Sequence, residues 1–316
     1  MPLNISRNDI FKVKAEAIVN PTDIFMSGSG STDRKIHKLA GRKLDEECQR
    51  IGTLPPGQAV ITGAYELKDF RYIIHTCGPV YTDGQHDEEK ILASCYENCL
   101  ALAKEKEVSS IVFPLIAAGS FSFPQGRALR IASDVITGFL LENEMDVFLL
   151  VYDKQAFATA ERLYSDIHDY LSEQLEADDG LSIMSAPVMM EACYEKEALP
   201  VFEPDESFSQ CLIRMINESG FSDPQVYKKA NIDRKHFNHI INNKDYRPKK
   251  ETAVALAIGL QLNMDDTAAL LERAGFVLSR SSKFDLIIRY CIENGIYDIY
   301  RINEILFSED QKTLGC

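Results

Sequence analysis

The chain has 316 residues, more than a single domain usually contains, and this length indicates two domains. Hydrophobic residues make up 45% and charged residues 26%, a balance that excludes a disordered or fibrous protein. The longest apolar runs are too short to cross a bilayer, and the first residues lack the pattern of a signal peptide. We therefore expect a cytoplasmic protein without membrane partners.

The net charge of −14 is unevenly distributed along the chain. From residue 207 onward there are 15 Lys and Arg against 14 Asp and Glu, so residues 1–206 hold 19 against 34. The net negative charge of residues 1–206 therefore repels polyanions such as nucleic acids. Any anion that it binds must be captured locally, by backbone groups and helix ends.

The eight cysteines are scattered, without a CxxC pair or a Cys/His cluster at zinc spacing. This spacing argues against a disulfide framework and against a structural metal, so we expect reduced thiols. Cys95 and Cys99 are four residues apart on an expected helix. Either they meet each other, or they are two small buried side chains, which is the commoner case.

Strand-like and helix-like segments alternate up to about residue 175. Residues 34–52 and 125–144 carry their apolar positions on one helical stripe. Six short segments are strand candidates: residues 3–10, 15–20, 58–65, 72–78, 109–116 and 146–152. Several of them are apolar at nearly every position, as in strands covered on both faces. This alternation predicts an α/β domain with three layers over residues 1–175.

The rest of the chain changes character twice. Residues 176–206 are acidic, contain prolines and show no sustained period, which is typical of either a linker or an ordered strap. From residue 207 to 316, segments with helical spacing follow one another between Gly, Asp-Pro and Arg-Pro breaks. We expect this third part to be a smaller all-helical domain.

Two loops rich in small residues follow expected strands. Gly28 and Gly30 alternate with Ser27, Ser29 and Ser31 just before a helix, where unhindered backbone N–H groups can converge on an anion. Such a loop is often only a turn. A second loop, Ala117–Phe121, follows the strand at 109–116, and two such loops at neighbouring strand ends form a more specific pattern for gripping a diphosphate.

Five motifs in one order resemble those of the macrodomains, a family that binds ADP-ribose. The motifs are RNDI, AIVNPTD, SGSGSTDRKIHKLAG, IIHTCGPVY and IAAGSFSFP, and the resemblance covers roughly residues 1–173. It implies a three-layer αβα domain with a mixed sheet. It also implies ADP-ribose as ligand or product, with no other cofactor.

The resemblance assigns roles to individual residues. Asp9 and Ile10 match the pair that reads the adenine, and Asn20 matches the amide that holds the distal ribose. The loop Ser27, Gly28, Ser29, Gly30, Ser31 and Thr32, with Asp23, is expected to wrap the diphosphate and distal ribose. The residues Ala117, Ala118, Gly119, Ser120 and Phe121 are expected to close over the diphosphate, with Tyr152 near the adenosine half.

Asp33 aligns with the acidic residue that orients a water at the distal ribose in the hydrolase branch of the family. A carboxylate suits that chemistry because a bond at the anomeric carbon departs through a cation-like state. The alternative for Asp33 is a helix N-cap, since Asp is a favoured residue there. We expect Asp33 and Asn20 to be the catalytic residues, and we expect neither His37 nor His75 to act as a base.

Several positions depart from the family pattern. Asp23 replaces the second Asn of the family's NAAN motif, Ser29 and Ser31 replace glycines, and Arg34 replaces a small residue. These departures bear on turnover more than on binding. A zinc-dependent branch of the family has Cys and His in this loop; the loop here contains no Cys, so we predict no metal.

The helical part resembles the phage-repressor type of helix-turn-helix. The pattern predicts a first helix at about 223–230, a turn at 230–232 and a recognition helix at about 233–243. Between Asp223 and Lys250 there are eight Lys and Arg against three Asp. As nucleic-acid contacts we expect Arg234, Lys235, Asn238 and Asn242 in the groove, with Lys244, Arg247, Lys249 and Lys250 near phosphates. Small bundles of this type also serve as protein-interaction modules.

The sequence therefore predicts a macrodomain that binds ADP-ribose and hydrolyses mono-ADP-ribose from acidic residues of target proteins, joined to a helix-turn-helix-like domain. Two alternatives stay open. One is a non-catalytic reader of ADP-ribose or of a modified protein. The other is a regulator whose affinity for DNA responds to the nucleotide.

Overall fold

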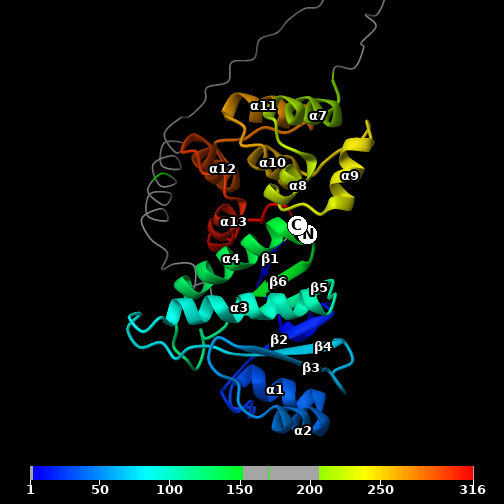
Figure 1. The fold of residues 1–316 in the computed structure, drawn as a ribbon. Helices are drawn as coiled ribbons and strands as arrows, with labels where there is room; N and C mark the ends of the chain where they lie inside the picture. The colour runs from blue at the N-terminus through cyan, green and yellow to red at the C-terminus, as the bar shows by residue number, and fades with distance from the viewer. Residues whose placement is uncertain (1–2, 152–169, 171–205, 316) are drawn as a thin grey trace, which may run out of the picture.

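The structure is a computed structural model that describes residues 3–151, residue 170 and residues 206–315 (Figure 1). Two parts are defined here: the α/β part, residues 3–151, and the helical bundle, residues 206–315. The acidic segment predicted at 176–206 lies outside the described residues, apart from Glu206.

The α/β part is built on one six-stranded sheet in the order β1-β6-β5-β2-β4-β3. Strands β1, β6, β5, β2 and β4 run parallel, and β3 pairs antiparallel with β4. The predicted mixed sheet is confirmed. The strands are β1 (Leu3–Ser6), β2 (Ala17–Thr22), β3 (Ala59–Gly63), β4 (Tyr72–Cys77), β5 (Ser110–Pro114) and β6 (Asp146–Leu150).

Helices cover both faces of this sheet, as the predicted three layers require (Figure 1). Helices α1 and α2 pack on one face, over Ile18 of β2 and Ile73 of β4. Helices α3 and α4 pack on the other face, over Val19 and Ile111. The helices are η1 (Ile10–Lys12, a 3-10 turn), α1 (Ser31–Ala40), α2 (Arg42–Ile51), α3 (Glu88–Glu105) and α4 (Gln125–Glu142).

The continuous stripe predicted over residues 34–52 is interrupted at Gly41. This glycine has φ 81° and separates α1 from α2, and its N–H donates to His37 O at 3.0 Å. The positive φ is what favours glycine here, because residues with a Cβ rarely adopt it. The periodicity fits both helices because the break keeps the same face toward the sheet.

The strand order creates a switch point between β2 and β5. After β2 the chain moves toward β3 and β4, whereas after β5 it moves toward β6, although β2 and β5 are parallel neighbours. The connections therefore leave the carboxyl ends of these two strands in opposite directions. Such a divergence opens a crevice at the strand ends, where α/β proteins bind ligands.

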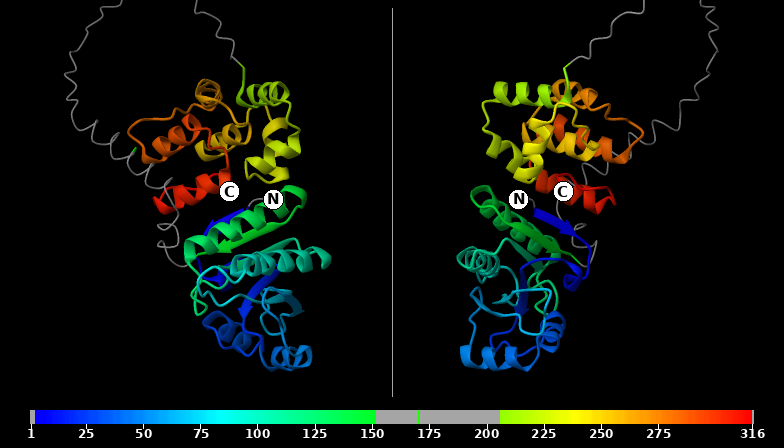
Figure 2. Two further views of the ribbon diagram at one scale, coloured as in Figure 1. Left: turned by 60° about the vertical axis from the view of Figure 1, so that its left-hand side comes forward. Right: turned by 90° about the vertical axis from the view of Figure 1, so that its right-hand side faces the viewer.

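The helical bundle stacks beside β1 and α4, at the edge of the sheet (Figure 1 and Figure 2). The described part of residues 207–316 is helical, as expected, and its last two helices lie within residues 283–308. The bundle contains α7 (Phe208–Ser219), α8 (Asp223–Lys229), α9 (Arg234–Asn242), α10 (Lys250–Gly259), α11 (Met264–Arg273), α12 (Lys283–Glu293) and α13 (Ile299–Ser308).

Buried hydrophobic residues connect the bundle and the α3/α4 layer into one continuous core. Polar contacts join the same surfaces: Tyr227 of α8 donates to Glu144 at 3.2 Å, and Ser133 of α4 donates to Glu304 of α13 at 3.0 Å. Within the described residues, no helix combines the length and the apolar content needed to span a bilayer.

Candidate functional site

A cavity of about 260 Å³ opens at the carboxyl ends of the strands, at the switch point. Thr22 of β2, Gly78 after β4, Pro114 of β5 and Val151 after β6 all contribute to its wall. Four neighbouring parallel strands thus end at one hollow. The topology alone produces this convergence, because parallel strands place their carboxyl ends at the same edge.

The first wall of the cavity is the start of α1. Ser29, Gly30, Ser31 and Thr32 line it, as the sequence predicts for this loop. The N-cap of α1 is Gly30, so no side chain caps the first turn. The backbone N–H groups of that turn, with the positive end of the helix dipole, can therefore receive an anion.

The second wall is the loop Ala117–Phe121, all of whose residues line the cavity. Ala117 is held at φ 61°, an uncommon conformation for a residue with a Cβ. Hydrogen bonds from Phe123 N to Ala117 O and from Tyr81 N to Phe121 O, at 3.1 and 2.9 Å, fix the loop. Residues of both loops therefore line the same cavity, and their grip on a diphosphate stays a prediction.

Asn20 and Asp33 contact each other, and neither is among the residues that line the cavity. Residues alternate along β2, so Asn20 and Thr22 point to the α1 side of the sheet. There Asn20 Nδ2 and Thr22 Oγ1 each donate to the Asp33 carboxylate at 2.7 Å. Asn20 and Asp33 are both fully buried. The sequence analysis assigned both residues to the site, but it did not anticipate that they would be buried and bonded to each other.

The alternative assignment of Asp33 as a helix N-cap is wrong. The helix begins two residues earlier, at Ser31, and Gly30 is the cap. Asp33 is therefore in the first turn with its side chain turned toward the sheet. Its carboxylate joins helix α1 to strand β2, and this link holds the first wall of the cavity in place.

Two histidines extend this buried network. His75 of β4 is in register with Asn20 and lies 3.1 Å from its amide nitrogen, and its other ring nitrogen lies 3.0 Å from Thr62. His37 lies between two carboxylates, 3.4 Å from Asp33 and 2.6 Å from Asp45. The side chain of His37 is 11% exposed.

The network holds its members in opposite charge states. Burial raises the pKa of Asp33, but hydrogen bonds from His37, Asn20 and Thr22 outweigh it and lower the pKa overall. The bond to Asp33 raises the pKa of His37, against burial. Burial lowers the pKa of His75 to about 3, so this ring is neutral. Asp33 and His37 thus form an ion pair next to a neutral His75.

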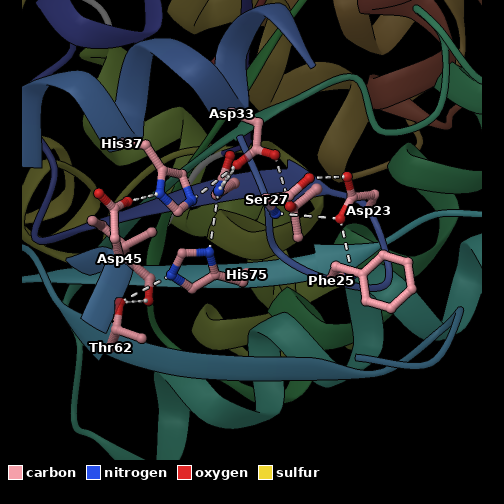
Figure 3. A network of polar contacts seen from close by, with 11 residues as sticks. Asp23, Phe25, Ser27, Asp33, His37, Asp45, Thr62 and His75 are labelled. Atoms are coloured by element: carbon pink, nitrogen blue, oxygen red, sulfur yellow. Dashed lines mark hydrogen bonds and ion pairs between the residues drawn. The ribbon is translucent and has the colours of Figure 1, made fainter. Parts of the chain in front are cut away.

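Asp23, at the end of β2, is one of the residues that line the cavity. Its oxygens accept from Phe25 N at 2.8 Å, from Ser27 N at 3.3 Å and from Ser27 Oγ at 2.6 Å (Figure 3). Partial burial raises the pKa of Asp23, but hydrogen bonds from Ser27 and Ser29 and from backbone N–H groups lower it below the ordinary value. The carboxylate is ionised and closes its own loop.

Other predicted site residues lie away from the cavity wall. Ile10 is fully buried in the core beneath α1, and Asp9 accepts from Phe11 N at 3.2 Å and pairs with Lys35 at 3.2 Å. Ser27 faces Asp23, and Gly28, at φ 72°, turns the chain. Tyr152 lies outside the described residues. The roles of these five in binding stay predictions.

The sequence reasoning missed part of the wall. The missed residues share a position at a strand end or at the start of α4: Pro21, Thr22, Gly78, Pro114, Leu115, Gln125 and Val151. The order of strands in the sheet is what brings them together. Pro21 and Thr22 are the two residues after the predicted strand 15–20, and Val151 is near the end of the predicted strand 146–152. A rule that adds the residues at the strand ends to each loop would have found them.

Neither of two clusters with metal-binding side chains offers a free ligand set. In the cluster of His37, Cys48 and His75, both nitrogens of His75 face polar partners, and burial raises the pKa of Cys48 to about 12. In the cluster of Asp83, His86 and Glu88, the Glu88 carboxylate accepts four backbone N–H groups of residues 82–86. The hydrogen bonds of the core explain the first cluster, and the hydrogen bonds of the loop at residues 82–86 explain the second.

In the bundle, the side chains predicted to contact nucleic acid lie on one helix. Arg234, Lys235, Asn238 and Asn242 are all exposed on α9. The turn between α8 and α9 is covered, however: Asn231 is 1% exposed and bonds to Leu3 of β1. The α/β part therefore flanks this pair of helices.

Known proteins are similar to this chain over the region that contains the two loops of the cavity. The model of the macro domain family matches residues 19–132, which include the end of β2, the first loop and the second loop. A macro domain-containing protein of Methanosarcina mazei is 40% identical over 174 residues, which are 53% of this chain and 92% of that protein. The chain belongs to the macro domain family.

Relatives with more specific names are similar over the same region. An O-acetyl-ADP-ribose deacetylase 1 of Pantoea vagans is 38% identical over 161 residues, 49% of this chain and 94% of that protein. Among solved structures, the macrodomain of Oceanobacillus iheyensis with ADP is 34% identical, covers 54% of this chain and 92% of that chain, and has a TM-score of 0.47.

Proposed function

We propose that the cavity at the switch point binds ADP-ribose. One observation carries this proposal: the cavity lies between the uncapped first turn of α1 and the loop Ala117–Phe121, and its wall contains no cation among the described residues. A ligand with a diphosphate can be held there by backbone N–H groups from both walls. Relatives named for O-acetyl-ADP-ribose are similar to this chain, and this similarity supports the choice of ADP-ribose among ligands that contain a diphosphate.

This mode of binding suits an acidic protein. A surface with net negative charge does not attract a free polyanion, so affinity must come from short hydrogen bonds in a partly closed site. Glycine at positions 30 and 119 leaves the backbone accessible, and a Cβ on Gly119 would meet nothing within 4 Å. The protein's own packing therefore does not require glycine at position 119, whereas close approach of a ligand would.

We further propose that the site hydrolyses the bond between the distal ribose and an acidic residue of a modified protein. Water would supply the oxygen that ends on the sugar, and the carboxylate of the target would leave. Some relatives are named O-acetyl-ADP-ribose deacetylases, and this name describes the hydrolysis of an ester of ADP-ribose. The similarity to them supports ester hydrolysis as the proposed reaction. Asp33 and Asn20 are the residues assigned to this step by resemblance.

Because Asn20 and Asp33 are buried, they would act on a ligand in the cavity through neighbouring residues. With Asp33 oxygens bonded to Asn20 and Thr22, the carboxylate orients the first turn of α1 and the end of β2. Thr22 belongs to the cavity wall, so Asp33 acts on the cavity through it. The same burial favours the second candidate of this kind, a reader that binds ADP-ribose without turning it over.

Label loss from an auto-modified ADP-ribosyltransferase tests turnover directly. The wild type should release the label, and Asp33→Ala and Asn20→Ala should release it more slowly by at least about tenfold. Calorimetric titration of the same variants with ADP-ribose separates binding from turnover. Tight binding of ADP-ribose with an unchanged label would leave the reader and exclude the hydrolase.

A separate function is proposed for the bundle: contact with nucleic acid through α9. The observation that favours it is the set of exposed basic residues on α9 and after it, of which Arg234, Lys244, Arg247 and Lys249 form no ion pair with described residues. Unpaired cations suit phosphates. Lys235 is close enough to Asp146 to influence its pKa, so the acidic α/β part limits the surface at the start of α9.

A gel shift at two salt concentrations tests this second function. Binding through phosphates should weaken steeply between about 50 and 200 mM salt, and Arg247→Ala together with Lys249→Ala should weaken it for every sequence tried. Absence of salt-sensitive binding by the full chain would remove both the nucleic-acid function and the nucleotide-responsive regulator. The bundle would then serve as an interaction module or as a cover for the sheet edge.

A further inference from the structure

The charge on the cavity wall is unusual for a site proposed to hold a diphosphate. Among the described residues that line the cavity, Asp23 is the one ionisable side chain, and its charge is negative. The closest cation along the first loop is Arg34, whose guanidinium donates to Ser29 O at 3.1 Å outside the wall. A bound diphosphate would therefore lie beside an acidic residue, with no Lys, Arg or His among the described residues that line the cavity.

The Asp23 carboxylate is held rigidly in this position. Phe25 N and Ser27 N donate to one oxygen, and the Ser27 hydroxyl donates to the other. These bonds favour the ionised form, so the charge persists at neutral pH. Asp23 follows β2 directly and begins the loop that continues to Ser29 and Gly30, so its charge belongs to the same wall as the proposed anion-binding amides.

A fixed negative charge distinguishes ligands that differ at the group beyond the first phosphate. In ADP-ribose the second phosphate is esterified, carries one charge and leads to ribose hydroxyls, which can donate to a carboxylate. In ADP the same phosphate is terminal and carries up to two charges at neutral pH, because a phosphate monoester loses its second proton near pH 6. The additional charge is repelled by a nearby carboxylate.

We propose that Asp23 is a specificity-determining residue that selects ADP-ribose against ADP and other nucleotides ending in a phosphate monoester. This proposal rests on the proposed binding of ADP-ribose. The carboxylate lowers affinity for a terminal phosphate and accepts a hydrogen bond from a hydroxyl. In a site where backbone groups supply the attraction, one opposing charge is enough to change the preference.

Asp23→Asn is the informative variant because it removes the charge and keeps the shape. Its amide oxygen can still accept from Phe25 N and Ser27 N, and the Ser27 hydroxyl can turn to accept from the new NH₂ group. The matched control is Asp69→Asn, which removes one charge from an exposed residue away from the cavity wall. Titration calorimetry with ADP-ribose and with ADP gives the ratio of the two dissociation constants for each protein.

The wild type should prefer ADP-ribose, and Asp23→Asn should reduce that preference by about fivefold or more, chiefly by tighter binding of ADP. Asp69→Asn should keep the wild-type ratio. A second readout is pH: ADP binding by the wild type should weaken between about pH 5.5 and 7.5 as the terminal phosphate ionises, and should weaken less in Asp23→Asn. ADP-ribose binding should change little over the same range in both proteins.

Two results would overturn the proposal. One is an unchanged ratio in Asp23→Asn with the pH dependence of ADP binding intact. The other is an equal loss of affinity for both ligands, which would make Asp23 a residue that only shapes the loop. A wild type that binds neither ligand would instead refute the proposed function itself, so the two failures are distinguishable.

Discussion

Asn231 and Leu3, 228 positions apart in the sequence, exchange two hydrogen bonds across the boundary between the bundle and the sheet. Leu3 N donates to Asn231 Oδ1 at 2.8 Å, and Asn231 Nδ2 donates to Leu3 O at 3.1 Å. β1 is an edge strand of the sheet, so its outer N–H and C=O groups would otherwise have no strand partner. One side-chain amide satisfies both groups as a neighbouring strand would.

This contact predicts a large cost for its removal. Asn231→Ala should lower the free energy of unfolding by about 2 kcal/mol, because two buried hydrogen bonds, each worth about 1 kcal/mol, would be lost. Urea unfolding of the full chain measures the change. Asn242→Ala, an exposed position on α9, should change stability by less than about 0.5 kcal/mol. Equal and small effects of the two substitutions would contradict the edge-strand role.

The buried carboxylate of Asp33 should be important for stability as well as for the site. Asp33→Ala should cost about 3 kcal/mol, since Asn20, Thr22 and the His37 cation would lose their common acceptor. Asp45, whose side chain is 49% exposed, provides the matched comparison, and Asp45→Ala should cost less than about 1 kcal/mol. Thermal or urea unfolding distinguishes them, and a reversed order would refute the network described here.

His75 predicts a loss of stability in mild acid. The pKa of His75 is about 3 in the folded protein, against 6.5 for the ordinary side chain. Below pH 6.5 the side chain is therefore protonated in the unfolded chain but stays neutral in the folded protein. Stability from this group is therefore fully present above pH 6.5 and falls as pH decreases, by about 2 kcal/mol at pH 5. His75→Gln should lack that component, so the difference between the two proteins should depend on pH. Parallel curves would contradict the buried neutral imidazole.

Glu304 predicts the opposite pH dependence at the contact between α4 and α13. Burial, together with Asp298 and Asp134, raises its pKa to about 7 against the opposing effects of Ser133 and Arg301. Its stabilising contribution is present below the ordinary pKa of 4.5 and is lost as pH rises through 7. Between pH 5 and 8 the wild type should lose on the order of 2 kcal/mol more than Glu304→Gln. A loss of equal size in Glu304→Gln would assign the effect to other groups.

Local patterns in the sequence predicted the elements well, because strands and helices depend on periodicity and on breaks such as Gly220 and the Ser222 to Pro224 segment. The two loops of the cavity could also be predicted, since Gly30 and Gly119 follow apolar strands. Contacts between distant segments could not. The residues around Asn231 do not indicate that it contacts the edge strand, and those around Ser133 do not indicate its contact with Glu304. Such pairs form only when the layers pack together.

The candidate site shows the same division. Asn20 and Asp33 could be named from their motifs, but their burial follows from the alternation of β2 and from the earlier start of α1 at Ser31. Asp23 was noticed as a departure from the family pattern, whereas its place as the ionisable residue of the wall depends on which described side chains line the cavity. The catalytic roles of Asn20 and Asp33, the adenine contacts of Asp9 and Ile10, and the cytoplasmic location stay predictions.

Gly119 gives the most direct test of the central claim, that ADP-ribose is held by bare backbone between the two walls. Calorimetric titration with ADP-ribose should be carried out on the wild type, on Gly119→Val and on Gly138→Val, a control on α4 where an added Cβ also meets nothing within 4 Å. The account predicts one binding event per chain for the wild type and the control, and at least about tenfold weaker binding for Gly119→Val at similar stability. Absence of binding to the wild type, or unchanged binding to Gly119→Val, would contradict it.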